Sequence, residues 1–366
     1  TKSIIMKKLE VFGAAKLKGQ VKISGSKNAS LPILAATLLS DKRISLTNIP
    51  RVKDVETMIK LLESMGSKVK VLKNKNSLII QNDKIIKAEA SYDLMSTMRA
   101  GIIVLGPLLA RFGKARASIP GGCNLGFRPI DIHLEALKKM GVKYKLVDGY
   151  INAKAKNGLV GAKIKFPKIS VGATENLMIA ACLAKGQTVL SNCAIEPEIK
   201  DLSNFLCSIG AKIVWTGRRQ VKIIGIKTFK QSNYKIMFDR IEAGTMLVAA
   251  AVNQGNLKLT GIETDILKTE INVLKKIGAK IIQKKNEIII QGNKKIKNIN
   301  IKTSPYPGFP TDLQSQLMVL LCKANKKSTI KEDIFANRFQ SVSELKRMDA
   351  KIEVKGNQAI IEGNTI

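Results

Sequence analysis

Apolar residues along the chain follow a pattern that occurs five times. In each copy a helical run with one charged face ends at a sharp turn and leads into alternating apolar and polar residues. The turns fall at intervals of 68 to 75 residues, at Gly66, Gly141, Gly210, Gly278 and Asp349. Glycine just past an amphipathic helix is typical of a C-cap, and the alternation after it predicts a strand. The pattern predicts five copies of one α/β unit of about seventy residues.

A second helix is expected about 35 residues before each of these turns. These segments are apolar on nearly all sides, which predicts buried helices, whereas the helices before the turns carry Lys and Glu on one face and should be outer. Each unit is thus predicted to run buried helix, strand, amphipathic helix and strand hairpin. The predicted buried helices span 31–40, 98–110, 174–184, 243–252 and 313–322.

The two ends of the chain suggest how the units are grouped. Residues 9–24 resemble the last strands of a unit, such as 287–302, without helices before them, and the fifth unit stops after its hairpin. We therefore expect two groups of three units with the sixth incomplete. One domain would comprise 1–26 plus 239–366 and the other 27–238. A free-standing solenoid of five repeats is the less favoured alternative.

The net charge of +34 brings a nucleic-acid-binding protein into consideration. Of the 62 basic residues only 11 are Arg, and the lysines are spread without a basic block. Aromatic residues, which would stack on bases, make up 4%. Lysines on solvated faces are the favoured interpretation, and they would attract anionic substrates. The start of the chain lacks the apolar stretch of a signal peptide, and no apolar run is long enough to span a membrane, so we expect a cytoplasmic protein.

Cysteine and histidine are too few for the common metal sites. The five cysteines are never spaced as CxxC, and His133 is the single histidine. The inventory favours neither a metal site nor a disulfide framework. His133 is expected to be a packing or hydrogen-bonding residue, because no partner for a catalytic triad is evident.

Two segments that depart from the common unit are candidate sites. In GSKNASLP (25–32), Lys27 and Asn28 lie where a strand meets a buried helix, a position that favours phosphate, although an N-cap with an exposed lysine is an equal alternative. In the glycine-rich loop 119–131, Arg128 could stabilise the thiolate of Cys123, which could then act as nucleophile or proton donor. The alternative there is an incidental surface cysteine.

Further candidates are a carboxylate and four arginines. Asp312 lies at the start of the fifth buried helix, where it is a cap or a general base. In a lysine-rich chain, retained arginines suggest bidentate binding of carboxylate or phosphate. The arginines at corresponding places are Arg99, Arg128, Arg240 and Arg338.

These motifs together resemble the enolpyruvyl transferases, and among them those that act on UDP-N-acetylglucosamine. The resemblance covers the whole chain and is carried mainly by GSKNASLPILAATLL (25–39), PGGCNLGFRPIDIHLEAL (120–137), DRIEAGT (239–245), FPTDLQSQ (309–316) and FANRF (335–339). It implies a two-domain, inside-out α/β barrel around a cleft, with a two-stranded crossing near Ser26 and Asp239. It also implies transfer of the enolpyruvyl group of phosphoenolpyruvate to the sugar 3-hydroxyl, in the first committed step of peptidoglycan synthesis, with no metal or organic cofactor.

The resemblance also implies residue roles. Cys123 matches the proton donor, which forms a covalent adduct and is alkylated by fosfomycin. Lys27, Asn28 and Arg128 match residues beside phosphoenolpyruvate, Asp312 matches the base, and Arg338 matches an active-site arginine. The positions that match nucleotide-sugar contacts are Arg99, Arg128, Pro129, Ile130, Asp131, Ile132, Lys168, Ile169, Ser170, Val171, Asp312 and Ile334.

One departure from the family pattern concerns the sixth unit. In the family this unit supplies a further arginine to the site, and losing such a cation would weaken transition-state stabilisation by several kcal/mol. The expectation is therefore that the chain as it stands is inactive or nearly so. A relative that binds UDP-N-acetylglucosamine without turnover is the alternative, with a nucleic-acid-binding protein built on the same repeat as a third possibility.

Overall fold

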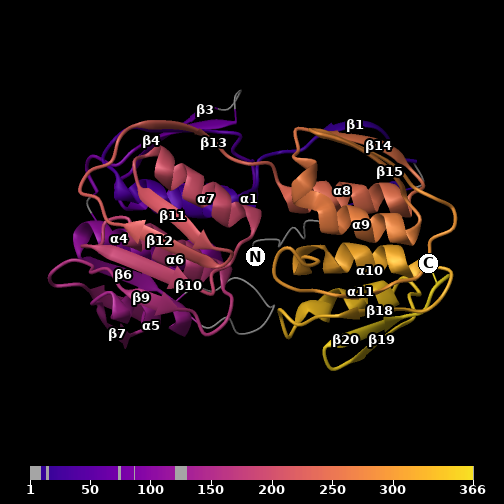
Figure 1. The fold of residues 1–366 in the computed structure, drawn as a ribbon. Coiled ribbons are helices and arrows are strands. Elements are labelled where there is room, and N and C mark those ends of the chain that lie inside the picture. The colour runs from indigo at the N-terminus through magenta and orange to yellow at the C-terminus, as the bar shows by residue number, and fades with distance from the viewer. Residues whose placement is uncertain (1–9, 14–15, 73–75, 86, 120–129, 366) are drawn as a thin grey trace, which may run out of the picture.

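The computed structural model describes residues 10–13, 16–72, 76–85, 87–119 and 130–365. These residues form two lobes (Figure 1), each with its own cluster of buried apolar side chains. The first cluster draws its buried residues from between Ala29 and Ile236. The second takes Ile23 together with residues from Phe238 to Ile361. Within the described part of the chain, no helix is long and apolar enough to cross a membrane.

The first lobe contains units one to three. The elements of unit one are α1 (Lys27–Ala36), η1 (Thr37–Leu39), β2 (Ile44–Thr47), α2 (Lys53–Ser64), β3 (Lys68–Leu72) and β4 (Ser77–Gln81). Those of unit two are β5 (Glu89–Ala90), α3 (Tyr92–Met95), η3 (Arg99–Val104), α4 (Leu105–Phe112), β6 (Lys114–Ser118), α5 (Asp131–Lys139), β7 (Lys143–Val147) and β8 (Tyr150–Lys154). Those of unit three are β9 (Lys163–Lys165), α6 (Val171–Ala181), β10 (Gln187–Ser191), α7 (Pro197–Ser208), β11 (Lys212–Gly217) and β12 (Gln220–Ile224), followed by β13 (Ser232–Lys235).

The second lobe contains units four and five together with β1 (Lys18–Lys22). The elements of unit four are α8 (Arg240–Val252), β14 (Asn256–Thr260), η4 (Thr264–Leu267), α9 (Lys268–Ile277), β15 (Lys280–Lys284) and β16 (Glu287–Gln291). Those of unit five are β17 (Asn300–Lys302), η5 (Thr311–Leu313), α10 (Gln314–Cys322), β18 (Ser328–Lys331), η6 (Arg338–Gln340), α11 (Ser341–Lys346), β19 (Ile352–Lys355) and β20 (Gln358–Ile361).

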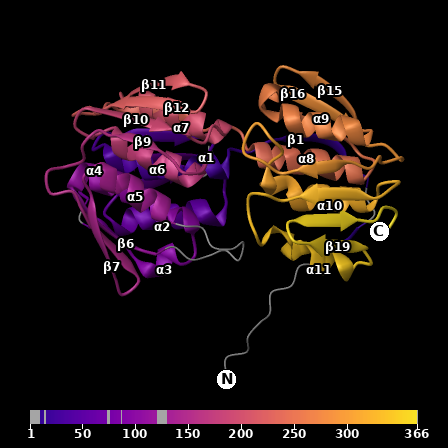
Figure 2. The same ribbon diagram turned by 60° about the horizontal axis from the view of Figure 1, so that its bottom comes forward.

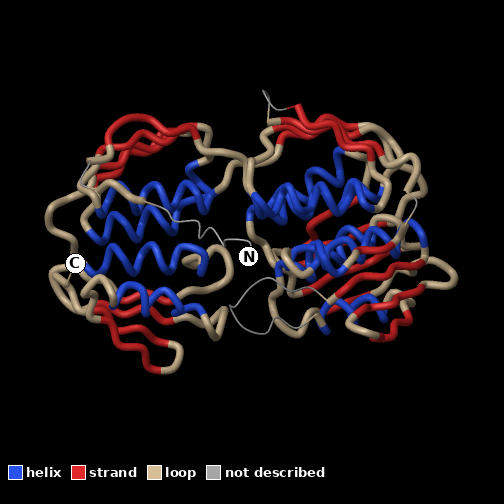
Figure 3. The backbone as a smooth tube through the Cα atoms, turned by 180° about the vertical axis from the view of Figure 1, so that it is seen from behind, coloured by secondary structure: helices blue, strands red, loops and turns tan. Residues whose placement is uncertain are grey.

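The buried helices lie inside each lobe and the sheets lie outside them (Figure 3), which is the inside-out α/β arrangement that the family resemblance implies. In α1 every residue from Ala29 to Ala36 is buried, and in α6 every residue from Ala173 to Ala181 is buried. α1 of unit one also packs against α7 of unit three. A solenoid would bring only neighbouring units into contact, so the solenoid alternative is wrong.

Each four-stranded sheet has the same topology. A short strand pairs in parallel with the strand that follows the buried helix, and the hairpin completes the sheet in antiparallel fashion, as in the order β5-β6-β8-β7. The sequence pattern predicts the hairpins but not this opening strand, which is as short as two residues in β5. A strand of that length leaves too little alternation to be recognised.

Two opening strands are exchanged between the lobes. β1 precedes α1 but pairs with β14 of unit four, whereas β13 precedes α8 but pairs with β2 of unit one. Figure 1 shows indigo β1 beside orange β14, and Figure 2 shows the two lobes from another side. The prediction that 9–24 are the last strands of a sixth unit is therefore wrong for residues 18–22, which form the opening strand of a sheet in unit four.

The turn positions of the repeat adopt the backbone conformation that the sequence predicts. Gly66, Gly141, Gly210 and Gly278 have φ between 91° and 111°, and Asp349 has φ of 67°. In this left-handed region a Cβ atom is unfavourable, and aspartate is among the few residues other than glycine that adopt it. The C-cap interpretation of all five turns is confirmed.

One predicted helix is divided in the structure. Residues 98–110 were expected to form a single buried helix, but the chain forms η3 and then α4, which extends to Phe112. The backbone N–H of Gly106 donates to the Asn176 side chain at 2.7 Å instead of to a helical carbonyl. Pro107, which has no N–H, lies in the first turn of α4, where proline is tolerated.

Exposed lysines on outer strands account for part of the positive charge. In β3, Lys68 and Lys70 are exposed, and in β7, Lys143 and Lys145 are exposed. Both strands lie at the edge of their sheets. Lysine at a sheet edge disfavours pairing with another chain, so these residues fit the solvated-face interpretation.

Candidate active site

The two lobes are joined by a pair of chain crossings. Gly25 and Phe238 form an antiparallel bridge. The N–H of Ser26 donates to the carbonyl of Met237 at 2.9 Å, and the N–H of Asp239 donates to the carbonyl of Ser24 at 2.9 Å. This confirms the expected crossing near Ser26 and Asp239. A Cβ atom on residue 25 would lie 1.6 Å from the Asn48 carbonyl oxygen, so only glycine fits there.

Asp239 links the crossing to two helices. Its Oδ1 accepts from the N–H groups of Ile241 and Glu242, both at 2.9 Å, and so caps α8. Its Oδ2 accepts from the backbone N–H of Lys27 at 3.1 Å, in the first turn of α1. One carboxylate therefore fixes the starts of both helices relative to each other.

Lys27 is the first residue of α1, as the sequence predicts for a strand-to-helix junction. Its Nζ lies 3.3 Å from Oδ2 of Asp54, and the two side chains are 43% and 38% exposed. An ion pair this open to water is weak, so an anionic ligand can displace the aspartate. Asn28 follows in the same turn, and the N-cap of the helix is Ser26, which accepts from the N–H of Ala29 at 3.2 Å.

The other described candidates of the first lobe also lie where helices begin. Arg99 is the first residue of η3. Ile130 is the N-cap residue of α5, and Asp131 and Ile132 lie in its first turn. Lys168 and Ile169 lead to the N-cap residue Ser170, and Val171 is the first residue of α6. Backbone N–H groups without helical partners occur at such positions and suit anionic or carbonyl groups of a ligand.

In the second lobe the structure brings two candidates into direct contact. Nη2 of Arg338 lies 2.9 Å from Oδ1 of Asp312, and Nε of Arg338 donates to the carbonyl of Thr311 at 3.2 Å. The side chain of Arg338 is 14% exposed and that of Asp312 is 41% exposed. The arginine therefore holds the carboxylate in one orientation while leaving it open to solvent and ligand.

A buried glutamate that the sequence analysis missed supports this pair. Oε1 of Glu332 accepts from the N–H groups of Ile334 and Phe335 at 2.8 and 3.1 Å, and Oε2 accepts from the Thr311 hydroxyl at 2.8 Å. Glu332 thus connects the turn that carries Asp312 to the segment that carries Ile334. Its only sequence signal is an acidic residue just after a strand, which is too common to single out.

The candidate arginines do not all lie at the same site, and Arg240 differs from Arg338. Arg240 is buried, and its Nε lies 2.9 Å from Oε1 of Glu198 on α7. Arg240 therefore binds a carboxylate, as suggested for the scarce arginines, but this carboxylate belongs to the protein and lies between the lobes. Cys123, Arg128 and Pro129 lie outside the described residues, in the segment that connects β6 to α5.

The four described cysteines are poor nucleophiles. Burial raises the pKa of Cys193 to about 12 and also raises the pKa values of Cys182, Cys207 and Cys322. A thiol must ionise to react, so these four remain protonated at neutral pH. They leave Cys123 as the candidate for thiol chemistry.

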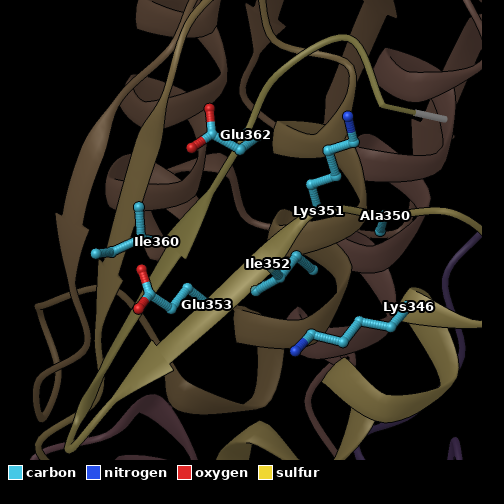
Figure 4. A pocket seen from close by; sticks show the side chains of 7 residues that line it. All are labelled: Lys346, Ala350, Lys351, Ile352, Glu353, Ile360 and Glu362. Carbon is cyan, nitrogen blue, oxygen red and sulfur yellow. The ribbon is translucent and has the colours of Figure 1, made fainter.

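One surface hollow has no connection with the candidate residues. It has a volume of about 300 Å³ and lies on the outside of unit five, between α11 and the strands β19 and β20 (Figure 4). It is lined by Lys346, Ala350, Lys351, Ile352, Glu353, Ile360 and Glu362.

Sequence comparisons place the chain among known proteins. The profile of the EPSP synthase (3-phosphoshikimate 1-carboxyvinyltransferase) family matches residues 11–366. A UDP-N-acetylglucosamine 1-carboxyvinyltransferase of Pelagibacter ubique is 70% identical over 359 residues, covering 98% of this chain and 86% of the relative. A protein of the same name from Geotalea uraniireducens is 48% identical, covering 98% of this chain and 85% of that protein.

Solved structures agree on the fold. The enolpyruvyl transferase NikO from Streptomyces tendae matches with a TM-score of 0.86 at 19% identity, over 96% of this chain and 83% of the other. An EPSP synthase from Acinetobacter baumannii matches with a TM-score of 0.73 at 17% identity, over 97% of this chain and 83% of the other.

The coverage bears on the expected loss of activity. Because the chain matches 86% of the length of the Pelagibacter ubique relative, the comparisons do not support the expectation that a missing unit leaves it inactive. The family match spans nearly the whole sequence, and the inside-out α/β fold agrees with it. The chain therefore belongs to the EPSP synthase family of enolpyruvyl transferases.

Proposed function

We propose that this protein transfers the enolpyruvyl group of phosphoenolpyruvate to the 3-hydroxyl of UDP-N-acetylglucosamine and releases phosphate. The observation that carries the proposal is 70% identity, over 98% of the chain, to a protein named for this activity. We place the reaction in the cytoplasm, as the first committed step of peptidoglycan synthesis. The alternative of binding without turnover, and that of a nucleic-acid-binding protein, have no comparable support.

The reaction requires a base, an acid and cations, and the candidate residues supply these groups. Asp312, oriented by Arg338 at 2.9 Å, removes the proton of the sugar hydroxyl as its oxygen adds to C2 of phosphoenolpyruvate. The thiol of Cys123 donates the proton to C3, and Lys27 and Arg128 hold the phosphate and carboxylate groups. The tetrahedral ketal then loses a proton from its C3 methyl group to the Cys123 thiolate, while phosphate leaves C2 and takes the proton held by Asp312.

The nucleotide sugar is assigned to the helix starts of the first lobe. The exposed Lys168 and the capping Ser170 lie at the start of α6, and Ile130 lies at the start of α5. We assign it also to Asn28, Arg99, Arg128, Pro129, Asp131, Ile132, Ile169, Val171 and, from the second lobe, Asp312 and Ile334. We further propose that residues 1–26 with 239–366 act as one domain and 27–238 as the other, with the substrates between them.

A phosphate-release assay tests this function. The full chain should release phosphate only when both substrates are present, and fosfomycin should abolish the release. Asp312→Asn should lower kcat by at least about 100-fold. Asp265→Asn is the matched control, since Asp265 lies in the similar turn η4, is 85% exposed and pairs with nearby Lys268 at 3.0 Å.

Two further variants separate the assigned roles. Cys123→Ser should abolish fosfomycin sensitivity and alter the pH profile, and an unchanged response to both would contradict the assignment. Lys27→Ala should raise KM for phosphoenolpyruvate, whereas Lys53→Ala should not, because Lys53 is the exposed first residue of α2. If UDP-N-acetylglucosamine binds in calorimetry but no phosphate is released, the non-catalytic alternative is correct.

A further inference from the structure

A buried amide on α6 connects this helix to three other helical elements of the first lobe. Asn176, on α6, is fully buried, and its Oδ1 accepts from the N–H of Gly106 on α4 at 2.7 Å. Its Nδ2 lies 3.2 Å from the carbonyl oxygen of Ile102 in η3 and 3.0 Å from Nδ1 of His133 on α5. Both polar atoms of the Asn176 side chain are thus hydrogen-bonded, Oδ1 to α4 and Nδ2 to η3 and α5.

This arrangement fixes the protonation of His133. Because Oδ1 of Asn176 accepts from Gly106, its Nδ2 is the donor, so Nδ1 of His133 must accept. The proton of the neutral ring is then on Nε2. His133 is 6% exposed, and this burial lowers the pKa of the imidazole to about 4, with the nearby Asp131 carboxylate opposing the shift. The ring is therefore neutral and fixed at physiological pH.

Two glycines allow the close packing of the pair. A Cβ atom at Gly106 would lie 2.2 Å from Oδ1 of Asn176, so a side chain there would displace the amide. A Cβ atom at Gly172, the second residue of α6, would lie 3.4 Å from Cε1 and 3.5 Å from Nε2 of His133. The imidazole thus packs directly against the first turn of α6.

Three of the four elements connected by Asn176 begin with assigned nucleotide-sugar residues. Arg99 begins η3, Ile130 to Ile132 lie at the start of α5, and Lys168 to Val171 lie at the start of α6. The contacts of Asn176 reach η3 three residues from Arg99, and His133 directly follows Ile132. Small changes in the spacing of these helices would therefore move the assigned contacts relative to one another.

We infer that His133 and Asn176 are positioning residues that hold the three segments binding the nucleotide sugar in register. The inference rests on the proposed function, because it takes the assigned nucleotide-sugar residues as its premise. Neither residue acts as acid or base, since His133 is buried and neutral and Asn176 does not titrate. They affect the binding of UDP-N-acetylglucosamine and not the binding of phosphoenolpyruvate, which is assigned to Lys27 and Arg128.

Variants of His133 test the inference. His133→Phe fills the ring volume but removes the acceptor, so Nδ2 of Asn176 keeps only the Ile102 carbonyl. The Kd for UDP-N-acetylglucosamine, measured by calorimetry on the full chain, should rise about tenfold, while KM for phosphoenolpyruvate changes less than about twofold. His133→Asn places an oxygen near the position of Nδ1 and should restore the affinity to within about threefold.

The possible outcomes are distinct. Equal loss of affinity in His133→Phe and His133→Asn, or wild-type affinity in both, overturns the inference, because the acceptor then has no role. A parallel rise in KM for phosphoenolpyruvate, or unfolding of His133→Phe at 25 °C, also overturns it, since the pair would then be a general requirement of the fold. Failure of the unaltered protein to bind UDP-N-acetylglucosamine instead refutes the proposed function.

Discussion

Arg240 and Glu198 form a buried ion pair between the two lobes, with Nε of the arginine 2.9 Å and 3.2 Å from the two carboxylate oxygens. The side chains are 7% and 3% exposed. Oε1 of Glu270 lies 3.9 Å from Nη1 of the same arginine. Burial raises the pKa values of both glutamates, and the arginine opposes each shift. Arg240 thus offsets part of the cost of placing two carboxylates in the buried junction between the lobes.

Replacing this arginine should destabilise the protein strongly. Arg240→Met leaves Glu198 and Glu270 without their cation, and removal of one partner from a buried ion pair destabilises by about 3–5 kcal/mol. Urea unfolding followed by circular dichroism measures the effect. Arg347→Met is the control, because Arg347 pairs with Glu344 at 2.7 Å on the surface and should contribute less than about 0.5 kcal/mol. A wild-type urea midpoint for Arg240→Met would refute the expectation.

The pH dependence of stability should reveal a further buried carboxylate, Asp201. Burial raises the pKa of Asp201 from 3.8 to about 6, although hydrogen bonds from the Tyr234 hydroxyl at 2.7 Å and the Met237 N–H at 3.2 Å oppose the shift. The folded state therefore holds this proton more tightly than the unfolded state does. Its contribution to stability is complete below pH 3.8 and is lost as the pH rises through 6.

Asp201→Asn tests this assignment because it removes the ionisation. An amide can accept from Met237 through its oxygen, and the Tyr234 hydroxyl also reaches the Asp201 carbonyl at 3.0 Å. At pH 7 the variant should be more stable by about 2–3 kcal/mol, with the difference disappearing near pH 4. Urea midpoints from pH 4 to 8 measure it, and parallel curves for the two proteins would contradict the assignment. Asp83→Asn should instead destabilise the protein slightly at pH 7, because Lys68 lowers the pKa of this exposed carboxyl.

The turn of unit five offers a test of the repeat itself. Asp349 adopts φ of 67° at the position where the other four units have glycine. Asp349→Gly should stabilise the protein by about 0.5–1 kcal/mol, because a left-handed conformation is unfavourable for a residue with a Cβ atom. Gly210→Asp is the reciprocal change and should destabilise by a similar amount. A Cβ atom there would lie 3.8 Å from the nearest atom, on Lys230, so a steric clash would not explain the loss.

Local patterns predicted the units but not their exchange of strands. Gly66 and its counterparts mark each C-cap because the helix pattern and the turn lie side by side in the sequence. The pairing of Lys18 with Asn256 joins residues more than 200 positions apart, and neither β1 nor β14 carries a signal that selects its partner. Strand pairing over such distances depends on tertiary packing, which periodicity does not record.

The residues of the candidate site were likewise only partly predictable from the sequence. Lys27, Asp312 and Arg338 could be proposed because each departs from the repeat or belongs to a scarce residue type. Asn176 and Glu332 could not, because their importance comes from being buried with every acceptor and donor in use. A polar residue on an apolar helix or after a strand has many possible causes, and only the partners distinguish them.

Glu332 provides the last test, since it connects the segments that carry Asp312 and Ile334. It is 3% exposed and accepts three hydrogen bonds. Glu332→Ala leaves buried donors without acceptors and frees the two segments, so kcat/KM should fall roughly 10- to 100-fold. Glu332→Gln can still accept from both N–H groups and donate to Thr311, so its kcat/KM should stay within about fivefold of the wild-type value.

The comparison of these two variants separates positioning from charge. If Glu332 acts through its charge on Asp312, Glu332→Gln should be as inactive as Glu332→Ala. If it acts by holding the segments, only Glu332→Ala loses activity, and its kcat should fall together with a rise in KM for UDP-N-acetylglucosamine, because Ile334 moves as well. Glu344→Ala, in the same unit but 68% exposed, should leave both constants unchanged. Wild-type kinetics for Glu332→Ala would show that the segments keep their places without the carboxylate.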